Sequence, residues 1–261
     1  MLADRTGLGE ALFGVLLLAG VTSLPDFAAT LDAAIDARPD LAMSNVMGSM
    51  AVNLVFLGVA DIVYRKANLE HAAASHVNLM LAGLLIVLLT LPLLAIFTPT
   101  VTLWGIHPIT PVIVAAYLFG LRLVHHTLAR PMWFPRQTYQ TVSDEPEKRP
   151  RGRSTTLWFG FIGMAVMTGI AGWILMEAAK VIALATSTPE LVTTIAAIRI
   201  GALTLAVSNI FGTNCFNMLV VAAADVGYPH GSIYHDMAPV QMTWGLVSIL
   251  MTAILLLGLV R

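Results

Sequence analysis

Long apolar stretches alternate with short polar connections along most of the chain. A helix needs about 20 apolar residues to cross a bilayer core that is ~30 Å thick. Stretches of this length are expected at 8–35, 41–63, 78–97, 108–126, 203–223 and 237–260, and a longer one lies at 155–199. The longer stretch has room for two crossings joined near Gly169–Trp173. The pattern therefore predicts an all-α polytopic membrane protein with about eight spans.

Two polar interruptions of these apolar stretches share one pattern. Thr22-Ser23-Leu24-Pro25-Asp26 returns 164 positions later as Thr186-Ser187-Thr188-Pro189-Glu190. At the same offset Ser44–Ser49 returns as Ser208–Thr213, and further polar residues pair as Asn53 with Asn217, Asp61 with Asp225, and Tyr64 with Tyr228. A gap-free match in polar residues and helix breakers indicates an internal duplication. Residues 22–53 and 186–217, called here the first and second cassettes, are typical of a transporter site built from internal repeats.

The first cassette predicts a helix that breaks within the membrane and restarts there. Ser23 and Asp26 have the S-x-x-D spacing of a capping box, and Pro25 is tolerated in the first turn of a helix. Backbone groups freed by such a break are tolerated only where they face protein or a water-lined cavity. Farther along, Asn45 and Asn53 need polar partners, because an amide at membrane depth is costly without one.

The composition agrees with a membrane location. Hydrophobic residues make up 57% of the chain and charged residues 11%, and the mean hydropathy is +0.82. About a quarter of residues are charged in ordinary soluble domains, so that class is excluded. The expected surroundings are a lipid bilayer, and the expected location is the cell membrane. The net charge of −1 gives no indication of a nucleic-acid partner, and the single cysteine, Cys215, excludes an intrachain disulfide.

A polar, proline-rich and basic segment at 128–154 divides the chain into two halves. The N-terminal half, 1–127, carries the first cassette, and the C-terminal half, 155–261, carries the second. Because Lys and Arg collect on the cytoplasmic side, the linker and the N-terminus are expected to be cytoplasmic. Two crossings at 155–199 then place the loop at 225–236 outside, together with the short loop at Arg38. In this arrangement the second cassette is inverted relative to the first.

Inverted repeats bring two broken helices to one site near the membrane midplane. Asp26 and Glu190 would face each other there, within a shell of hydroxyl and amide side chains. Oxygen ligands suit hard cations such as Ca²⁺, Na⁺ or Mg²⁺ better than they suit zinc or copper. Two buried carboxylates are costly unless they are neutralised. One divalent cation, two monovalent cations or two protons would each do so, which is a physical basis for exchange.

The two cassettes resemble the α-repeats of the cation/calcium exchanger superfamily, of the Na⁺/Ca²⁺ exchanger type. The family pattern is approximately G-T-S-x-P-E, followed about twenty residues later by G-N-x-x-G-S-N-x-x-N/D. The resemblance implies ten helices in two inverted groups, and a secondary active antiporter that exchanges Ca²⁺ for Na⁺ or H⁺ without a cofactor. On matching positions it implies cation ligands at Thr22, Ser23, Asp26, Ser49, Asn53, Thr186, Ser187, Glu190, Thr213 and Asn217.

The chain departs from the family pattern at several positions. Asp26 stands where the family usually has Glu, Met50 replaces the usual Asn, and Asn217 stands where some members carry Asp. Relative to the family, the chain begins after the first helix, so that about eight of the ten helices are expected in it.

Two other functions remain open from the sequence. One is a cation channel, which would need no ion on the opposite side of the membrane. The other is a shortened, transport-deficient form of an exchanger. If the chain is not such a form, a partner subunit is expected to supply the missing helix; a homo-oligomer also remains open. A membrane enzyme is disfavoured, because the chain shows no nucleophile–base set and no His-Glu metal motif. The sequence also leaves open whether Na⁺, H⁺ or K⁺ drives exchange.

Overall fold

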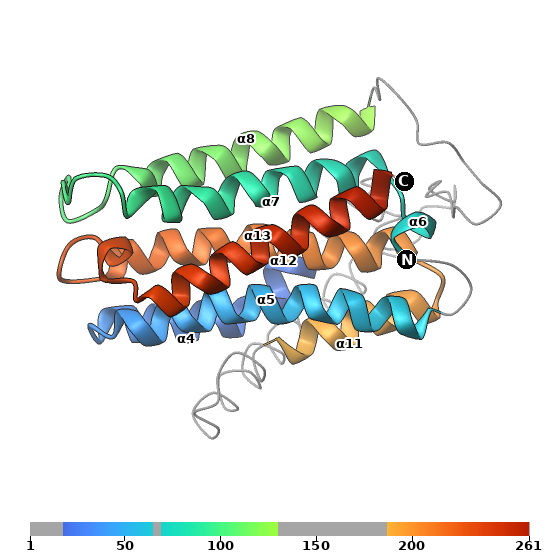
Figure 1. Cartoon of the computed structure of the whole chain (residues 1–261), viewed down its shortest axis with the longest axis horizontal. Helices are drawn as coiled ribbons and strands as arrows, with labels where there is room; N and C mark the ends of the chain where they lie inside the picture. Colours follow the sequence, from blue (N-terminus) through green and yellow to red (C-terminus); the bar gives the residue numbers. More distant parts are fainter. Residues whose placement is uncertain (1–17, 65–68, 130–186, 261) are drawn as a thin grey trace, which may run out of the picture.

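The computed structural model describes residues 18–64, 69–129 and 187–260, and all regular structure in these ranges is helical (Figure 1). Five helices there are long and apolar enough to cross a membrane: α5 (Pro39–Val63), α7 (His76–Ala95), α8 (Ile109–Ala129), α12 (Leu203–Gly227) and α13 (Pro239–Val260). The shorter elements are α3 (Ala19–Thr22), α4 (Leu24–Ile35), α6 (Leu69–Ala72), α11 (Thr188–Arg199) and the 3₁₀ helix η2 (Ile233–Asp236). Residues 155–186 of the two crossings expected at 155–199, and nearly all of the expected linker, lie outside the described residues.

The duplication seen in the sequence reappears in the helix boundaries. Helices α4 and α11 each have 12 residues, and α5 and α12 each have 25. The bounds of each pair differ by the offset that separates the cassettes, and the same offset relates α6 to η2. Equivalent sequence positions therefore start and stop equivalent helices in both copies.

The two copies run in opposite directions, as predicted. In Figure 1, α5 runs from left to right and α12 from right to left, and α4 and α11 are likewise opposed. The C-terminal ends of α8 and α11 lie at the same end of the bundle, which agrees with the inverted orientation predicted for the second cassette. The inverted-repeat fold is confirmed.

The first cassette breaks its helix at Ser23, which ends α3 and precedes α4. The predicted capping box is wrong, however, because the side chain of Ser23 makes no capping hydrogen bond. Its torsions, φ −81° and ψ −1°, are close to helical, whereas a capping serine adopts an extended conformation that aims its hydroxyl at the next turn. Ser187 has nearly the same torsions, φ −86° and ψ 0°, and also makes no cap. The prolines two residues later, Pro25 and Pro189, lack the N–H of a continuous helix.

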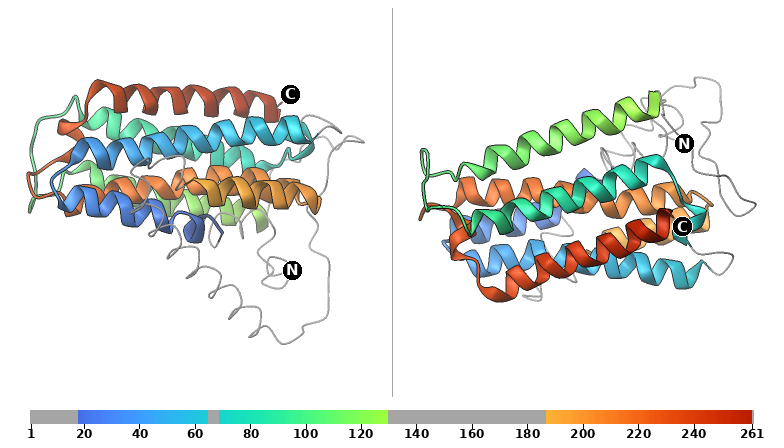
Figure 2. Two further views of the ribbon diagram at one scale, coloured as in Figure 1. Left: turned by 90° about the horizontal axis from the view of Figure 1, so that it is seen from below. Right: turned by 45° about the horizontal axis from the view of Figure 1, so that its top comes forward.

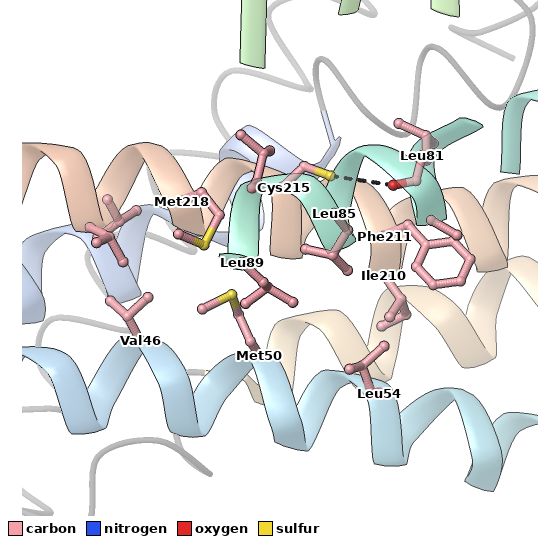
Figure 3. Close-up of a cluster of buried hydrophobic side chains, with 14 of the residues drawn as sticks. Val46, Met50, Leu54, Leu81, Leu85, Leu89, Ile210, Phe211, Cys215 and Met218 are labelled. Carbon is pink, nitrogen blue, oxygen red and sulfur yellow. Dashed lines mark hydrogen bonds between the residues drawn. The ribbon is translucent and has the colours of Figure 1, made fainter. Parts of the chain in front are cut away.

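Helix α12 runs through the middle of the bundle, and α8 and α13 lie at its outside (Figures 1 and 2). Helix α12 packs against α3, α4, α5, α7, α8 and α11. Figure 3 shows the apolar cluster where α5, α7 and α12 meet, with Met50, Leu85 and Met218 near its centre. The outer helices expose large apolar side chains instead, such as Phe119 on α8 and Leu250 on α13, as expected for surfaces that face lipid.

In each copy a matched aspartate accepts a hydrogen bond from the first residue of the short helix that follows. The Oδ1 atom of Asp61 accepts a hydrogen bond of 2.6 Å from the backbone N–H of Leu69, the first residue of α6. The Oδ1 atom of Asp225 accepts one of 3.1 Å from the backbone N–H of Ile233, the first residue of η2. The two bonds lie at equivalent positions, so this matched pair has a structural role.

Asp225 also joins two connections that are distant in sequence. Its Oδ2 atom accepts hydrogen bonds from the backbone N–H of His107, at 2.9 Å, and from the hydroxyl of Thr110, at 2.5 Å. The Thr110 hydroxyl lies 2.8 Å from the hydroxyl of Tyr234. Burial, and then the nearby charge of Asp225, raise the pKa of Tyr234 above its usual value, so its hydroxyl stays protonated. The loops at 96–108 and 228–238 are thereby fastened together at one end of the bundle, as the predicted topology requires.

We expect the Asp225→Asn variant to be destabilised. An amide would turn its NH₂ group toward backbone donors that the carboxylate now satisfies, at a cost of about 2–3 kcal/mol. Thermal unfolding of the purified protein in detergent measures this loss as a lower midpoint. The control is Asp236→Asn, at an exposed acid that accepts a 2.7 Å hydrogen bond from the Tyr228 hydroxyl. Equal shifts in the two variants would contradict the structural role of Asp225.

Candidate functional site

Nine of the ten predicted ligands lie in the described part of the chain, and all nine are buried; Thr186 lies outside it. Thr22 is 3% exposed, and the rest are 0% exposed: Ser23, Asp26, Ser49, Asn53, Ser187, Glu190, Thr213 and Asn217. They come from the first turns of α4 and α11, from the residues that precede these helices, and from the middles of α5 and α12. Hydroxyls of the two copies approach each other, with Thr22 Oγ1 and Thr213 Oγ1 3.5 Å apart.

Asp26 is held by donors from both copies. The Ser49 hydroxyl on α5 donates to its Oδ1 atom at 3.0 Å, and Nδ2 of Asn217 on α12 donates to its Oδ2 atom at 3.3 Å. The position in the first turn of α4 adds the favourable field at a helix N-terminus. Three of the predicted ligands therefore meet at one carboxylate.

Glu190 occupies the equivalent place in α11 but is held differently. Neither of its carboxylate oxygens has a partner within strict hydrogen-bonding distance among the residues that the structure describes, although the Thr22 hydroxyl lies near enough to stabilise its charged form. The residues equivalent to the donors at Asp26 are Thr213 and Asn53, and Asn53 donates its amide to Asn214 instead. The charges of Asp26 and Glu190 repel each other across the site. The two acids therefore form one electrostatic unit with unequal surroundings.

Several other oxygens of the predicted set have no partner either. They are Ser23 Oγ, Asn53 Oδ1, Ser187 Oγ and Asn217 Oδ1, and each is buried. Buried polar atoms in native proteins nearly always have a partner, such as water or an ion, so a group of orphaned oxygens needs an explanation. All four oxygens can accept, and a cation bound between the cassettes would satisfy several of them at once. The described residues include no group of three or more His, Cys, Asp or Glu side chains suited to a metal, so the donors here are mostly neutral oxygens.

The matched asparagines in the N-terminal parts of α5 and α12, Asn45 and Asn209, have a different role. Asn45 on α5 donates through Nδ2 to the hydroxyl of Thr30 on α4, at 2.9 Å. The equivalent Asn209 on α12 donates to the hydroxyl of Thr194 on α11, at 3.5 Å, and to that of Thr193, at 3.1 Å. These bonds fasten each broken helix to the helix that follows it. Thr30 and Thr194 lie at the same offset as the two cassettes, so the repeat in the sequence could have been used to predict these contacts.

A family model matches most of the chain. The family model described as sodium/calcium exchanger protein matches residues 1–124 and 156–261. The inner membrane protein YrbG of Escherichia coli (strain K12) is 25% identical over 239 residues, which cover 85% of this chain and 70% of YrbG.

Solved structures of the sodium-calcium exchanger NCX_Mj have a similar fold. One, soaked with zero Na⁺ and Ca²⁺, gives a TM-score of 0.61 at 18% identity and covers 97% of this chain and 82% of that chain. Another, soaked with 2.5 mM Na⁺ and 0.1 mM Sr²⁺, gives a TM-score of 0.63 at 18% identity and covers 98% and 82%. At this level of identity the likeness shows the fold.

We expect the Glu190→Gln variant to unfold at a higher temperature than the wild type when cations are withheld. An amide costs less to bury without partners than a carboxylate does. We also expect added Ca²⁺ to stabilise the wild type, by about 2.7 kcal/mol at 100 times the dissociation constant, and to leave this variant without that gain. Thermal unfolding in a Na⁺-free buffer, with chelator or with Ca²⁺, measures both effects.

The matched control for this experiment is Asp36→Asn, which neutralises an exposed acid at the end of α4 that pairs only with the exposed Arg38 in the described part of the chain. It should respond to Ca²⁺ as the wild type does. An undiminished response in Glu190→Gln would show that Glu190 lies outside the cation site.

Proposed function

Because the chain belongs to the sodium/calcium exchanger family, we propose that it is an antiporter that exchanges Ca²⁺ for Na⁺ or H⁺ at the site between the two cassettes. Families of this kind consist of transporters rather than enzymes, and this chain is a multi-pass membrane protein. The proposal concerns which ions are exchanged and which residues bind them.

The observation that carries the proposal is the pairing of two buried carboxylates with orphaned oxygens from both cassettes. Asp26 and Glu190 contribute up to four oxygens, and Ser23, Asn53, Ser187 and Asn217 contribute one unpartnered oxygen each. Ca²⁺ takes 6–8 oxygen ligands in flexible geometry, which a shell of this kind supplies. A single divalent cation also balances two carboxylates. Thr22, Ser49, Thr213 and Thr186 complete the proposed ligand set.

The need to neutralise the two carboxylates favours an exchange of ions over a free release of ions from the site. Two ionised carboxylates in an apolar bundle are costly, because each has lost its hydration. A conformational change that carries the site from one side of the membrane to the other is therefore favourable only when the charges are neutralised. One Ca²⁺, two Na⁺ or two H⁺ meet this requirement equally. The site returns to the first side of the membrane with a different ion bound, and the fluxes of the two ions are thereby coupled.

The unequal surroundings of Asp26 and Glu190 indicate which of the two acids a monovalent ion or a proton would neutralise. Asp26 already accepts hydrogen bonds from Ser49 and Asn217, which stabilise its charged form. Among the described residues Glu190 has only the weaker contact of the Thr22 hydroxyl, so its charge depends more strongly on a cation or a proton. Glu190 is thus the acid at which a monovalent ion or a proton would substitute for Ca²⁺.

The test is Ca²⁺ flux in proteoliposomes that contain the purified chain, with the ion on the opposite side varied one at a time. We expect Ca²⁺ uptake to require Na⁺ or H⁺ inside the vesicles and to be absent with choline or K⁺ alone. Asp26→Asn and Glu190→Gln should each reduce uptake to that of empty vesicles, because one remaining carboxylate cannot balance Ca²⁺. Asp36→Asn, at an exposed acid, is the control that should keep the activity.

Two outcomes would contradict the proposal. Ca²⁺ uptake that is indifferent to the internal ion would indicate a channel. Normal exchange by either Asp26→Asn or Glu190→Gln would show that the two-carboxylate site is wrong.

A further inference from the structure

We propose that Asn214 is a positioning residue that turns the amide oxygen of Asn53 toward the cation site, and that Met50 deprives Asn217 of the equivalent support. This inference rests on the function proposed above, since it assigns a role at the same site. It makes the site asymmetric through a residue that does not itself bind the ion.

The orientation of Asn214 is set by a backbone carbonyl. Its Nδ2 atom donates a 3.0 Å hydrogen bond to the carbonyl oxygen of Met50 on the facing helix α5. A carbonyl oxygen only accepts, so the NH₂ group of Asn214 must face it. The Oδ1 atom of Asn214 then points away from that carbonyl and is left to accept. Asn214 is 0% exposed, so water does not compete for these bonds.

The orientation of Asn53 follows from that of Asn214. Nδ2 of Asn53 donates to Oδ1 of Asn214 at 3.0 Å. Since one end of the Asn53 amide is taken as a donor, its other end, Oδ1, is directed elsewhere, and it is among the buried oxygens without a partner. The relay from the Met50 carbonyl through Asn214 therefore decides which atom of Asn53 is offered to a cation. It does so without involving either carboxylate.

The other copy lacks this relay. The position equivalent to Asn214, at the cassette offset, is Met50. Its side chain lies in the apolar cluster with Leu89 and Met218 (Figure 3), and a thioether offers no N–H and only a weak acceptor. Nδ2 of Asn217, the equivalent of Asn53, donates to Asp26 Oδ2 at 3.3 Å instead. The orientation of Asn217 thus depends on the charge of an ion-binding acid, whereas that of Asn53 does not.

The consequence is that Asn53 is a preorganised ligand and Asn217 is not. Residues that orient metal ligands typically contribute about 10- to 100-fold to metal affinity. Loss of the relay at Asn214 should therefore weaken Ca²⁺ binding by that factor. Addition of a relay at position 50 should strengthen it, because Asn217 would be held with its oxygen toward the site and its NH₂ group away from Asp26.

The experiment measures the Ca²⁺ dissociation constant of the purified full chain by calorimetry. Asn214→Leu should weaken binding about 10- to 100-fold, whereas Met50→Leu, which keeps the backbone carbonyl and the apolar cluster, should leave it unchanged. In an Asn53→Ala background, Asn214→Leu should have no further effect, because the residue acts through Asn53. A purely structural role would instead give additive losses.

Met50→Asn provides a second arm that removes no existing contact of the relay. It should bind Ca²⁺ more tightly than the wild type, and it keeps the assignment testable if Asn214→Leu does not fold. Unchanged or weaker binding in Met50→Asn, or equal effects of Asn214→Leu with and without Asn53, would overturn the inference. A wild-type chain that binds no Ca²⁺ would contradict the proposed function itself, and the inference with it.

Discussion

The burial of two carboxylates in an apolar helix bundle is the constraint on which the rest of the structure depends. Asp26 and Glu190 are both fully buried, and their charges repel each other. Water stabilises neither, so the protein must supply donors, helix N-termini or a bound cation. It supplies the first two at Asp26, through Ser49, Asn217 and the first turn of α4. At Glu190 the described residues supply only the helix terminus and the nearby Thr22 hydroxyl, so most of the stabilisation of its charge is left to the transported ion.

The inverted duplication explains how one short sequence pattern builds both sides of such a site. A broken helix and the helix that follows it are fastened by the same asparagine–threonine bond in each copy, Asn45 to Thr30 and Asn209 to Thr194. Because the copies run in opposite directions, their breaks meet at the centre of the bundle rather than at opposite ends. Small departures between the copies, such as Met50 against Asn214, then make the two halves of the site chemically different without altering the helices.

Much of this could be predicted from the sequence, because a polar pattern that is repeated at a fixed offset reports on structure in both copies at once. The helix bounds, the inversion and the burial of the nine described candidate ligands follow from that repeat. The capping box at Ser23 was predicted wrongly, since spacing alone does not reveal a near-helical backbone that turns the hydroxyl away. The network around Asp225 was not predicted, because His107 and Thr110 belong to a connection without a counterpart in the repeat. Asn214 was overlooked as a positioning residue, although the mismatch with Met50 marked it.

The central claim, that one cation is shared by the two acids, is tested most directly by diffraction. Crystals grown with Sr²⁺ in place of Ca²⁺ give an anomalous signal at the position of the ion. We expect one peak between the first turns of α4 and α11, within roughly 2.6 Å of carboxylate oxygens of both Asp26 and Glu190, and no such peak in Glu190→Gln crystals. A peak that contacts only one of the two acids, or a peak that persists in Glu190→Gln, would contradict it.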